Sequence, residues 1–200
     1  MTVGLPASSA ASRNLANSSR GLHRPLTPVA PRMLPPMRLV AQPEGLLQVH
    51  TAPFRGSFGS VLSQALRTAG LGSRVLVSQF LKGGVDQGLE AGTWLCGRLQ
   101  WLRPAVAACV DQSAAEAPEV AEAVAEVWAF SRQQLLSGAV DLMVLDELGL
   151  AVELGHVSLD DVVSSLERRP AHLDVILTGP AMPAELMAMA DQVTQLRRGL

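Results

Sequence analysis

Residues 143–147 read Met-Val-Leu-Asp-Glu, three apolar residues followed at once by two carboxylates. The apolar run reaches back to Val140 with a single polar interruption, which is typical of a strand covered on both faces. A carboxylate at such a strand end holds a metal in many nucleotide-binding proteins, and it can equally be an exposed acidic strand end. This stretch therefore predicts a buried parallel strand that carries Asp146 and Glu147 at its end.

Strand-like and helix-like segments alternate on both sides of this stretch. Short runs with the composition of strands occupy residues 46–51, 74–80, 173–177 and 192–196. Apolar residues at helical spacing or capping residues predict helices over residues 57–69, 118–136, 158–168 and 183–190,. Residues 84–112 are predicted to be irregular. The alternation predicts an α/β fold, a mostly parallel sheet flanked by helices.

The first 43 residues differ in composition from the rest of the 200-residue chain. They contain five arginines and no acidic residue, and they show no hydrophobic periodicity. Such a segment buries too little apolar surface to offset its ordering entropy, so residues 1–43 are predicted to be a disordered leader. An Arg-rich, acid-free leader also fits an organelle transit peptide. Residues 44–200 then form one domain of ordinary size.

Charge and composition exclude several classes of function. From Glu44 onward, 18 acidic residues outnumber 11 basic ones, which gives no reason to expect a nucleic-acid partner,. No apolar run reaches the roughly 18–20 residues that cross a bilayer, so no membrane association is expected. Cys96 and Cys109 lack the spacing of a zinc site or a disulfide framework,. Two reduced thiols and a cytoplasmic location are the expectation.

The segment after the first strand lies where a phosphate-binding loop belongs in this kind of fold. Such loops follow the pattern GxxxxGK[ST], in which backbone N–H groups and the lysine hold phosphate and the hydroxyl holds magnesium. In this chain Ala52 stands for the first glycine, and Gly56 matches the second. Ser57 stands for the lysine, and Phe58 stands for the hydroxyl residue. Taken alone, the loop is a weak match to the pattern.

Several blocks in order along the chain resemble one family, the ATP:corrinoid adenosyltransferases of the CobA/BtuR type. The blocks are Val49 to Gly72, Val-Leu-Val-Ser-Gln-Phe-Leu-Lys-Gly at 75–83, Val-Leu-Asp-Glu-Leu at 144–148, Arg169-Pro170, Leu177-Thr178-Gly179 and the ending from Ala190 to Arg197. The resemblance is specific because the blocks recur at the family's spacings over residues 46–197.

The resemblance implies a P-loop NTPase fold of the RecA-like kind, a homodimer, and transfer of the 5′-deoxyadenosyl group of MgATP to a Co(I) corrinoid. It implies that nucleotide contacts come from Thr51, Arg55, Gly56, Gln79 and Lys82. By the same resemblance, Asp146 and Glu147 are the catalytic and magnesium-side residues. Trp101 matches the tryptophan of the family's corrinoid-side element, although a partly buried core tryptophan is an alternative interpretation,.

The loop departs from the family pattern at the positions that matter most for phosphate. Ser57 carries no charge, Phe58 offers no oxygen to magnesium, and Ala52 replaces a glycine,. Three hypotheses follow. The chain is a family member with lost or reduced ATP-dependent transfer, or an active adenosyltransferase in which Arg55 or Lys82 replaces the missing lysine, or a non-catalytic scaffold.

Overall fold

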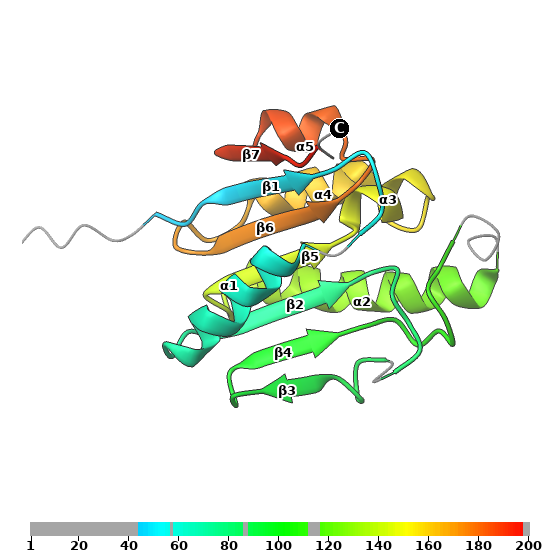
Figure 1. The fold of residues 1–200 in the computed structure, drawn as a ribbon, viewed down its shortest axis with the longest axis horizontal. Coiled ribbons are helices and arrows are strands. Elements are labelled where there is room, and N and C mark those ends of the chain that lie inside the picture. Colours follow the sequence, from blue (N-terminus) through cyan, green and yellow to red (C-terminus); the bar gives the residue numbers. More distant parts are fainter. Residues whose placement is uncertain (1–43, 57, 86–87, 112–116, 198–200) are drawn as a thin grey trace, which may run out of the picture. The chain divides into compact units, whose positions relative to one another are not determined.

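A seven-stranded sheet forms the centre of the protein (Figure 1). The computed structural model describes residues 44–56, 58–85, 88–111 and 117–197. The strands, in the order β3-β4-β2-β5-β6-β1-β7 across the sheet, are β1 (Leu47–Thr51), β2 (Val75–Gln79), β3 (Thr93–Leu95), β4 (Leu99–Leu102), β5 (Leu142–Asp146), β6 (Asp174–Gly179) and β7 (Gln192–Gln195). All neighbouring strands pair in parallel except β3, which is antiparallel to β4 at one edge. The predicted α/β fold with a mostly parallel sheet is confirmed.

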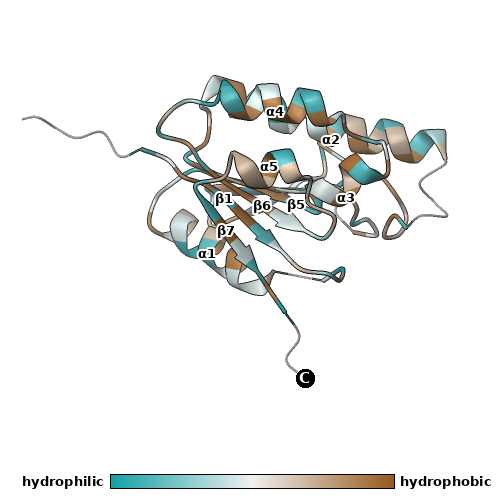
Figure 2. Ribbon diagram, turned by 90° about the horizontal axis from the view of Figure 1, so that it is seen from above, coloured by the Kyte–Doolittle hydropathy of each residue, from teal (hydrophilic) through white to brown (hydrophobic). Residues whose placement is uncertain are grey.

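Helices cover both faces of this sheet, but unequally. The helices are α1 (Gly59–Gly70), α2 (Pro118–Ser137), α3 (Leu148–Glu153), α4 (Leu159–Glu167) and α5 (Ala184–Ala188). Figure 2 shows α1 on one side of the strands and the other four helices on the opposite side. Two buried apolar clusters correspond to these layers, a large one under α2–α5 and a smaller one under α1.

Local signals in the sequence account for the helix ends. Helix α2 has a proline at its first turn and ends at Gly138, whose φ of 64° is easily adopted by glycine,. At α4 the Ser158 hydroxyl accepts a hydrogen bond from the backbone N–H of Asp161. The Asp161 carboxylate does not complete a capping box, because it accepts from Trp128 Nε1 at 2.7 Å and pairs with Arg132 at 3.0 Å. Asp161 therefore ties α4 to α2.

The start of β1 is fixed by side chains from the far end of the chain. The backbone N–H of Leu46 donates to Asp174 Oδ1 at 2.8 Å, and that of Leu47 donates to Asp191 Oδ2 at 2.7 Å. Gly45 lies so close to Leu173 that a Cβ on it would be 2.4 Å from the Leu173 backbone. β1 is thus held between β6 and β7 from its first residue.

The strand order decides where functional side chains meet. β6 lies between β1 and β5, the strands that carry the loop and Asp146. This order is that of the RecA-like arrangement that the family resemblance implies. Parallel strands end at the same edge of a sheet, so the residues after β1, β2, β5 and β6 lie close together. That edge is where a ligand site is expected in such a fold.

The prediction that residues 84–112 are irregular is wrong in part. They contain β3 and β4, joined by a tight turn in which Cys96 and Gly97 have φ values of 44° and 66°. Strands of three and four residues are too short to leave a clear alternation in the sequence,. The short α3 was also not predicted, since it follows Glu147 directly. In the described part of the chain, no helix has the length and apolarity needed to cross a membrane.

Candidate functional site

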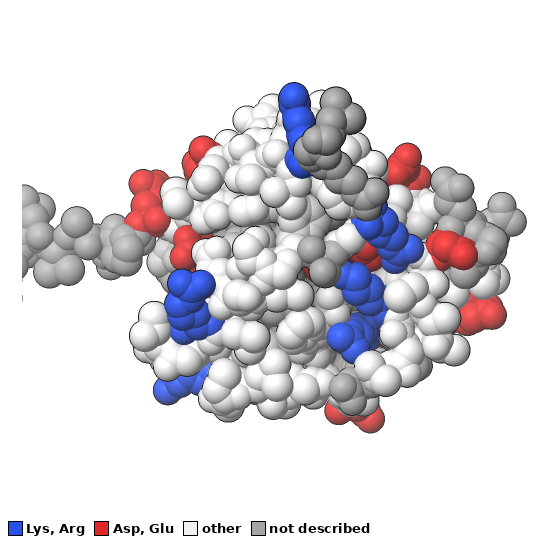
Figure 3. Space-filling model, in the orientation of Figure 1, with Lys and Arg blue, Asp and Glu red and all other residues white. Residues whose placement is uncertain are grey.

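Charged side chains gather where β2, β5 and β6 end. Figure 3 shows basic and acidic surface side by side at this end of the molecule. The Asp146 carboxylate is almost completely buried, and its Oδ2 accepts from Lys82 Nζ at 2.6 Å and from Gln79 Nε2 at 2.8 Å. Its Oδ1 accepts from Thr178 Oγ1 at 2.5 Å. Gln79, Asp146 and Thr178 are register partners on three neighbouring strands, so the sheet itself builds this cluster.

Gln79 extends the cluster toward the edge of the sheet. Its Oε1 accepts from Trp101 Nε1 at 2.8 Å and from Arg103 Nε at 2.9 Å. The Arg103 guanidinium lies over the Trp101 ring, 5.7 Å from the ring centroid. Trp101 is half-buried and packs against the smaller apolar cluster. The structure therefore places Trp101 beside a predicted nucleotide-side residue and gives it core contacts as well.

Glu147 and Arg55 form a second, adjacent pair. Arg55 Nε donates to Glu147 Oε1 at 2.8 Å, and Arg55 Nη2 donates to Glu147 Oε2 at 2.9 Å. The same guanidinium donates to the carbonyls of Val110 at 2.5 Å and Leu81 at 2.9 Å. The hydrogen bonds to Glu147 raise the pKa of Arg55, while partial burial opposes this. All three nitrogens of Arg55 are thus bonded within the protein.

The backbone around Glu147 is tightly constrained. Glu147 has a φ of 62°, and its N–H donates to the Thr178 carbonyl at 2.9 Å. A Cβ on Gly179 would lie 2.8 Å from the Glu147 Cα, so β6 can end beside β5 in this way only with glycine at 179,. Gly179 therefore allows the approach that turns the Glu147 side chain, which is 1% exposed, toward Arg55.

The arrangement does not fit a magnesium ion as it stands. Each carboxylate oxygen of Asp146 and Glu147 accepts a hydrogen bond from a protein donor. Magnesium demands near-octahedral oxygen ligands, and Phe58 offers none at the hydroxyl position. Within the described residues, no group of three or more His, Cys, Asp and Glu side chains has the arrangement of a metal site. Binding would require these ion pairs to open.

The loop itself has become part of the apolar interior. Phe58 is 4% exposed and Ala52 is 5% exposed, and both belong to the cluster under α1. A Cβ on Gly56 would lie 3.6 Å from the ring of Phe54, which is an ordinary contact distance. The predicted loop position Ser57 lies outside the described residues. Aromatic rings thus occupy positions beside the chain that, in the family pattern, curls around phosphate.

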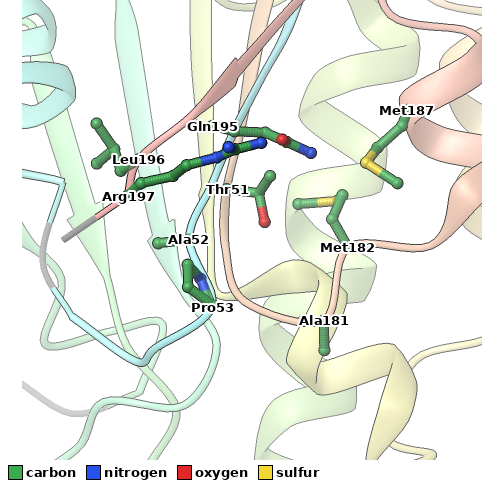
Figure 4. Close-up of a pocket in the computed structure, with 9 residues that line it drawn as sticks. All are labelled: Thr51, Ala52, Pro53, Ala181, Met182, Met187, Gln195, Leu196 and Arg197. Carbon is green, nitrogen blue, oxygen red and sulfur yellow. The ribbon is translucent and has the colours of Figure 1, made fainter. Parts of the chain in front are cut away.

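Most of the predicted site residues are brought together, with one clear separation. Arg55, Gln79, Lys82, Asp146 and Glu147 form the two linked clusters just described, with Trp101 at their margin. Thr51, by contrast, lines a separate cavity near β7 (Figure 4).

Sequence reasoning missed two residues of the cluster, Thr178 and Arg103. Each follows or ends a strand next to Gln79 or Asp146, so a correct strand order would have revealed both.

His50, on β1, is the next register partner of Thr178. Its Nε2 is buried and has no hydrogen-bond partner among the described residues, and burial lowers its pKa. A lowered pKa in the folded state means that acid protonates the unfolded chain first. Stability should therefore be full above the unfolded value of about 6.5 and fall as the pH drops below it.

We expect the His50→Phe variant to lose part of this pH dependence. The measurement is the melting temperature at pH 7.5 and at pH 5.5. The difference between the two should shrink in His50→Phe and stay unchanged in His172→Gln, because His172 is exposed. His156 also has a pKa lowered by burial, so a residual slope is expected. An undiminished difference in His50→Phe would contradict the assignment.

Comparison with known proteins agrees with this geometry. Residues 43–199 match the family model described as ATP:corrinoid adenosyltransferase BtuR/CobO/CobP. The corrinoid adenosyltransferase of Escherichia coli K12 is 30% identical over 159 residues, covering 76% of each chain. Corrinoid adenosyltransferase CobA of Salmonella typhimurium gives the same values, and the Pseudomonas aeruginosa enzyme is 30% identical over 152 residues, covering 76% of this chain and 74% of its own. This chain therefore belongs to the ATP:corrinoid adenosyltransferase family.

Proposed function

We propose that this member of the family has lost, or has strongly reduced, ATP-dependent adenosyl transfer to corrinoids. The observation that carries the proposal is the pairing of the charged site residues with one another. Arg55 is bound to Glu147, and Lys82 is bound to Asp146. In this state the cations that would meet triphosphate are neutralised by the carboxylates that would meet magnesium.

The loop residues support the same conclusion. A charge-assisted hydrogen bond is worth roughly 1.5–3 kcal/mol, so a serine at the lysine position forgoes about ten- to a hundredfold in affinity or rate. Phe58 replaces the magnesium-side hydroxyl with a ring buried in the apolar cluster. Pro53 supplies no backbone N–H to a phosphate. Binding of MgATP would have to break two ion pairs with fewer donors than the family pattern provides.

The corrinoid side of the protein is less altered. A cavity of about 510 Å³ lies beside Arg55, with apolar walls from Phe54, Leu150 and Leu154. Trp101 and Arg103 stand at the other margin of the cluster. These features support retention of a corrinoid as ligand. The homodimer implied by the family resemblance stays a prediction, as does the extent of the domain, residues 44–200.

An active adenosyltransferase is the second candidate, and one observation favours Lys82 over Arg55 as its phosphate ligand. Lys82 is 23% exposed and uses one of its three donors on Asp146,. All three nitrogens of Arg55 are already bonded. In this version Lys82 turns from Asp146 toward the nucleotide. A non-catalytic scaffold is the third hypothesis, and no particular contact favours it.

Calorimetric titration with MgATP tests the proposal, with the E. coli relative as positive control. We expect no measurable binding at micromolar nucleotide, and no adenosylated corrinoid when reduced corrinoid and MgATP are supplied anaerobically. Micromolar affinity for MgATP would contradict the proposal. Turnover that disappears in Lys82→Ala, with the fold intact by circular dichroism, would establish the second candidate instead.

A further inference from the structure

A second cavity lies on the far side of the loop from the ion pairs. It measures about 490 Å³ and lies between the ends of β1 and β7 and the segment leading into α5. Figure 4 shows Thr51 near its centre, Met182 and Met187 on one side, and Gln195 and Arg197 on the other. The volume is within the range of about 300–1,000 Å³ that is usual for small-molecule sites.

The walls of this cavity combine an apolar surface with a few polar groups. Met182 is 8% exposed and Met187 is half-buried, and Ala52 and Pro53 complete an apolar side. Methionine sulfur makes favourable contacts with aromatic rings. This wall is therefore suited to a flat aromatic ring rather than to a strongly polar group.

The polar groups lie opposite and are not used by the protein. In the described part of the chain, neither the Thr51 hydroxyl, the Gln195 amide nor the Arg197 guanidinium has a hydrogen-bond partner. A hydroxyl and an amide can bond the edge nitrogens of a heteroaromatic ring, and a guanidinium binds phosphate with two parallel hydrogen bonds. This contrasts with the Asp146 and Glu147 cluster, where every charged group is already paired.

We propose that this cavity, called here the methionine pocket, binds an aromatic nucleotide through its base and its phosphate. The base lies against Met182 and Met187, Thr51 and Gln195 bond its edge, and Arg197 binds the phosphate. Two sources share this chemistry: a free mononucleotide, and the aromatic nucleotide tail that complete corrinoids carry. The pocket needs no magnesium and none of the ion-paired residues, so the inference stands apart from the fate of adenosyl transfer.

The probes are adenosine 5′-monophosphate, hydroxocobalamin, and cobinamide, which lacks the nucleotide tail, each titrated calorimetrically against the full chain. Two variants address the pocket, Arg197→Gln for the phosphate and Met187→Ala for the ring. Their matched controls are Arg98→Gln, at an exposed arginine of the β3–β4 turn, and Met189→Ala, at a methionine that does not line the pocket. Lys82→Ala reports on binding at the ion-paired cluster instead.

Adenosine monophosphate should bind, and Arg197→Gln should weaken it about tenfold or more, because a charge-assisted contact is lost. Met187→Ala should weaken it less, and the two controls and Lys82→Ala should leave it unchanged. If the corrinoid tail is the source, hydroxocobalamin binds with the same sensitivity to Arg197→Gln and cobinamide does not. Binding that is insensitive to both pocket variants, or abolished only by Lys82→Ala, would overturn the proposal, as would binding of none of the probes.

Discussion

Replacing Arg55 by methionine is expected to lower the free energy of unfolding by about 2–3 kcal/mol. The Glu147 carboxylate is 1% exposed, and without the guanidinium it would stay buried with no cation beside it. The change also removes the donors that Arg55 gives to the carbonyls of Val110 and Leu81, which tie the loop to two other segments. Methionine has a similar length, so loss of packing contributes little. Urea unfolding of the purified protein measures the effect.

A surface ion pair provides the matched control. Arg74 pairs with Asp141 at 3.0 Å, but the two side chains are 52% and 40% exposed. Exposed pairs contribute about 0–1 kcal/mol, so Arg74→Met should lose less than about 1 kcal/mol. The Arg55→Met/Glu147→Gln double variant should be more stable than Arg55→Met alone, because it no longer buries an unpaired charge. Equal losses in Arg55→Met and Arg74→Met would show that the buried pair has no special role.

Phe58→Thr is expected to be the other most damaging change, with a loss of about 3 kcal/mol. The Phe58 ring is 4% exposed in the cluster under α1, and removing a buried phenyl ring costs about 3–5 kcal/mol before the remaining threonine atoms are counted,. Restoration of the family's magnesium-side hydroxyl at this position therefore conflicts with the present core. The free energy of unfolding from urea titration, with and without MgATP, measures both effects.

The comparison that isolates this conflict uses Ser57→Lys and the Ser57→Lys/Phe58→Thr double variant. Ser57→Lys alone should stay close to the parent protein, because surface substitutions usually change stability by less than about 0.5 kcal/mol. The double variant should be unstable without nucleotide and should regain stability with MgATP if the loop again binds it, since a ligand stabilises the state that it binds. A loss below about 1 kcal/mol in Phe58→Thr would mean that the ring is not needed for packing.

The position of the site could be predicted from the sequence, but its internal contacts could not. An apolar run ending in Asp146-Glu147 placed both carboxylates at a strand end, and the structure has them there. The sequence also shows that Phe58 lacks a hydroxyl. It does not show that the ring lies in the core, because local pattern alone does not tell which face of a short loop is covered. The Arg55–Glu147 pair joins residues 92 positions apart, and such a contact depends on the strand order.

Thr51 illustrates the same limit. Its position directly before the loop, read through the family resemblance, predicted a nucleotide contact beside Lys82 and Asp146. Strand residues alternate between the two faces of a sheet, so Thr51 shares its face with Val49 and Leu47, toward α5,. The polar row of Gln79, Asp146 and Thr178 lies on the other face, under α1. A one-residue difference in register along β1 thus separates the methionine pocket from the ion pairs.

The way in which β1 is held has a consequence for synthesis on the ribosome. β1 is the first strand of the domain to emerge, yet both of its neighbours, β6 and β7, and the two aspartates that fix its start lie at residue 174 or later. It has no native partner until nearly the whole chain has been translated, and contacts this distant in sequence form slowly. During that interval Leu47 and Val49 are exposed as an unpaired apolar strand, which is the kind of segment that chaperones bind and that aggregates when left unprotected.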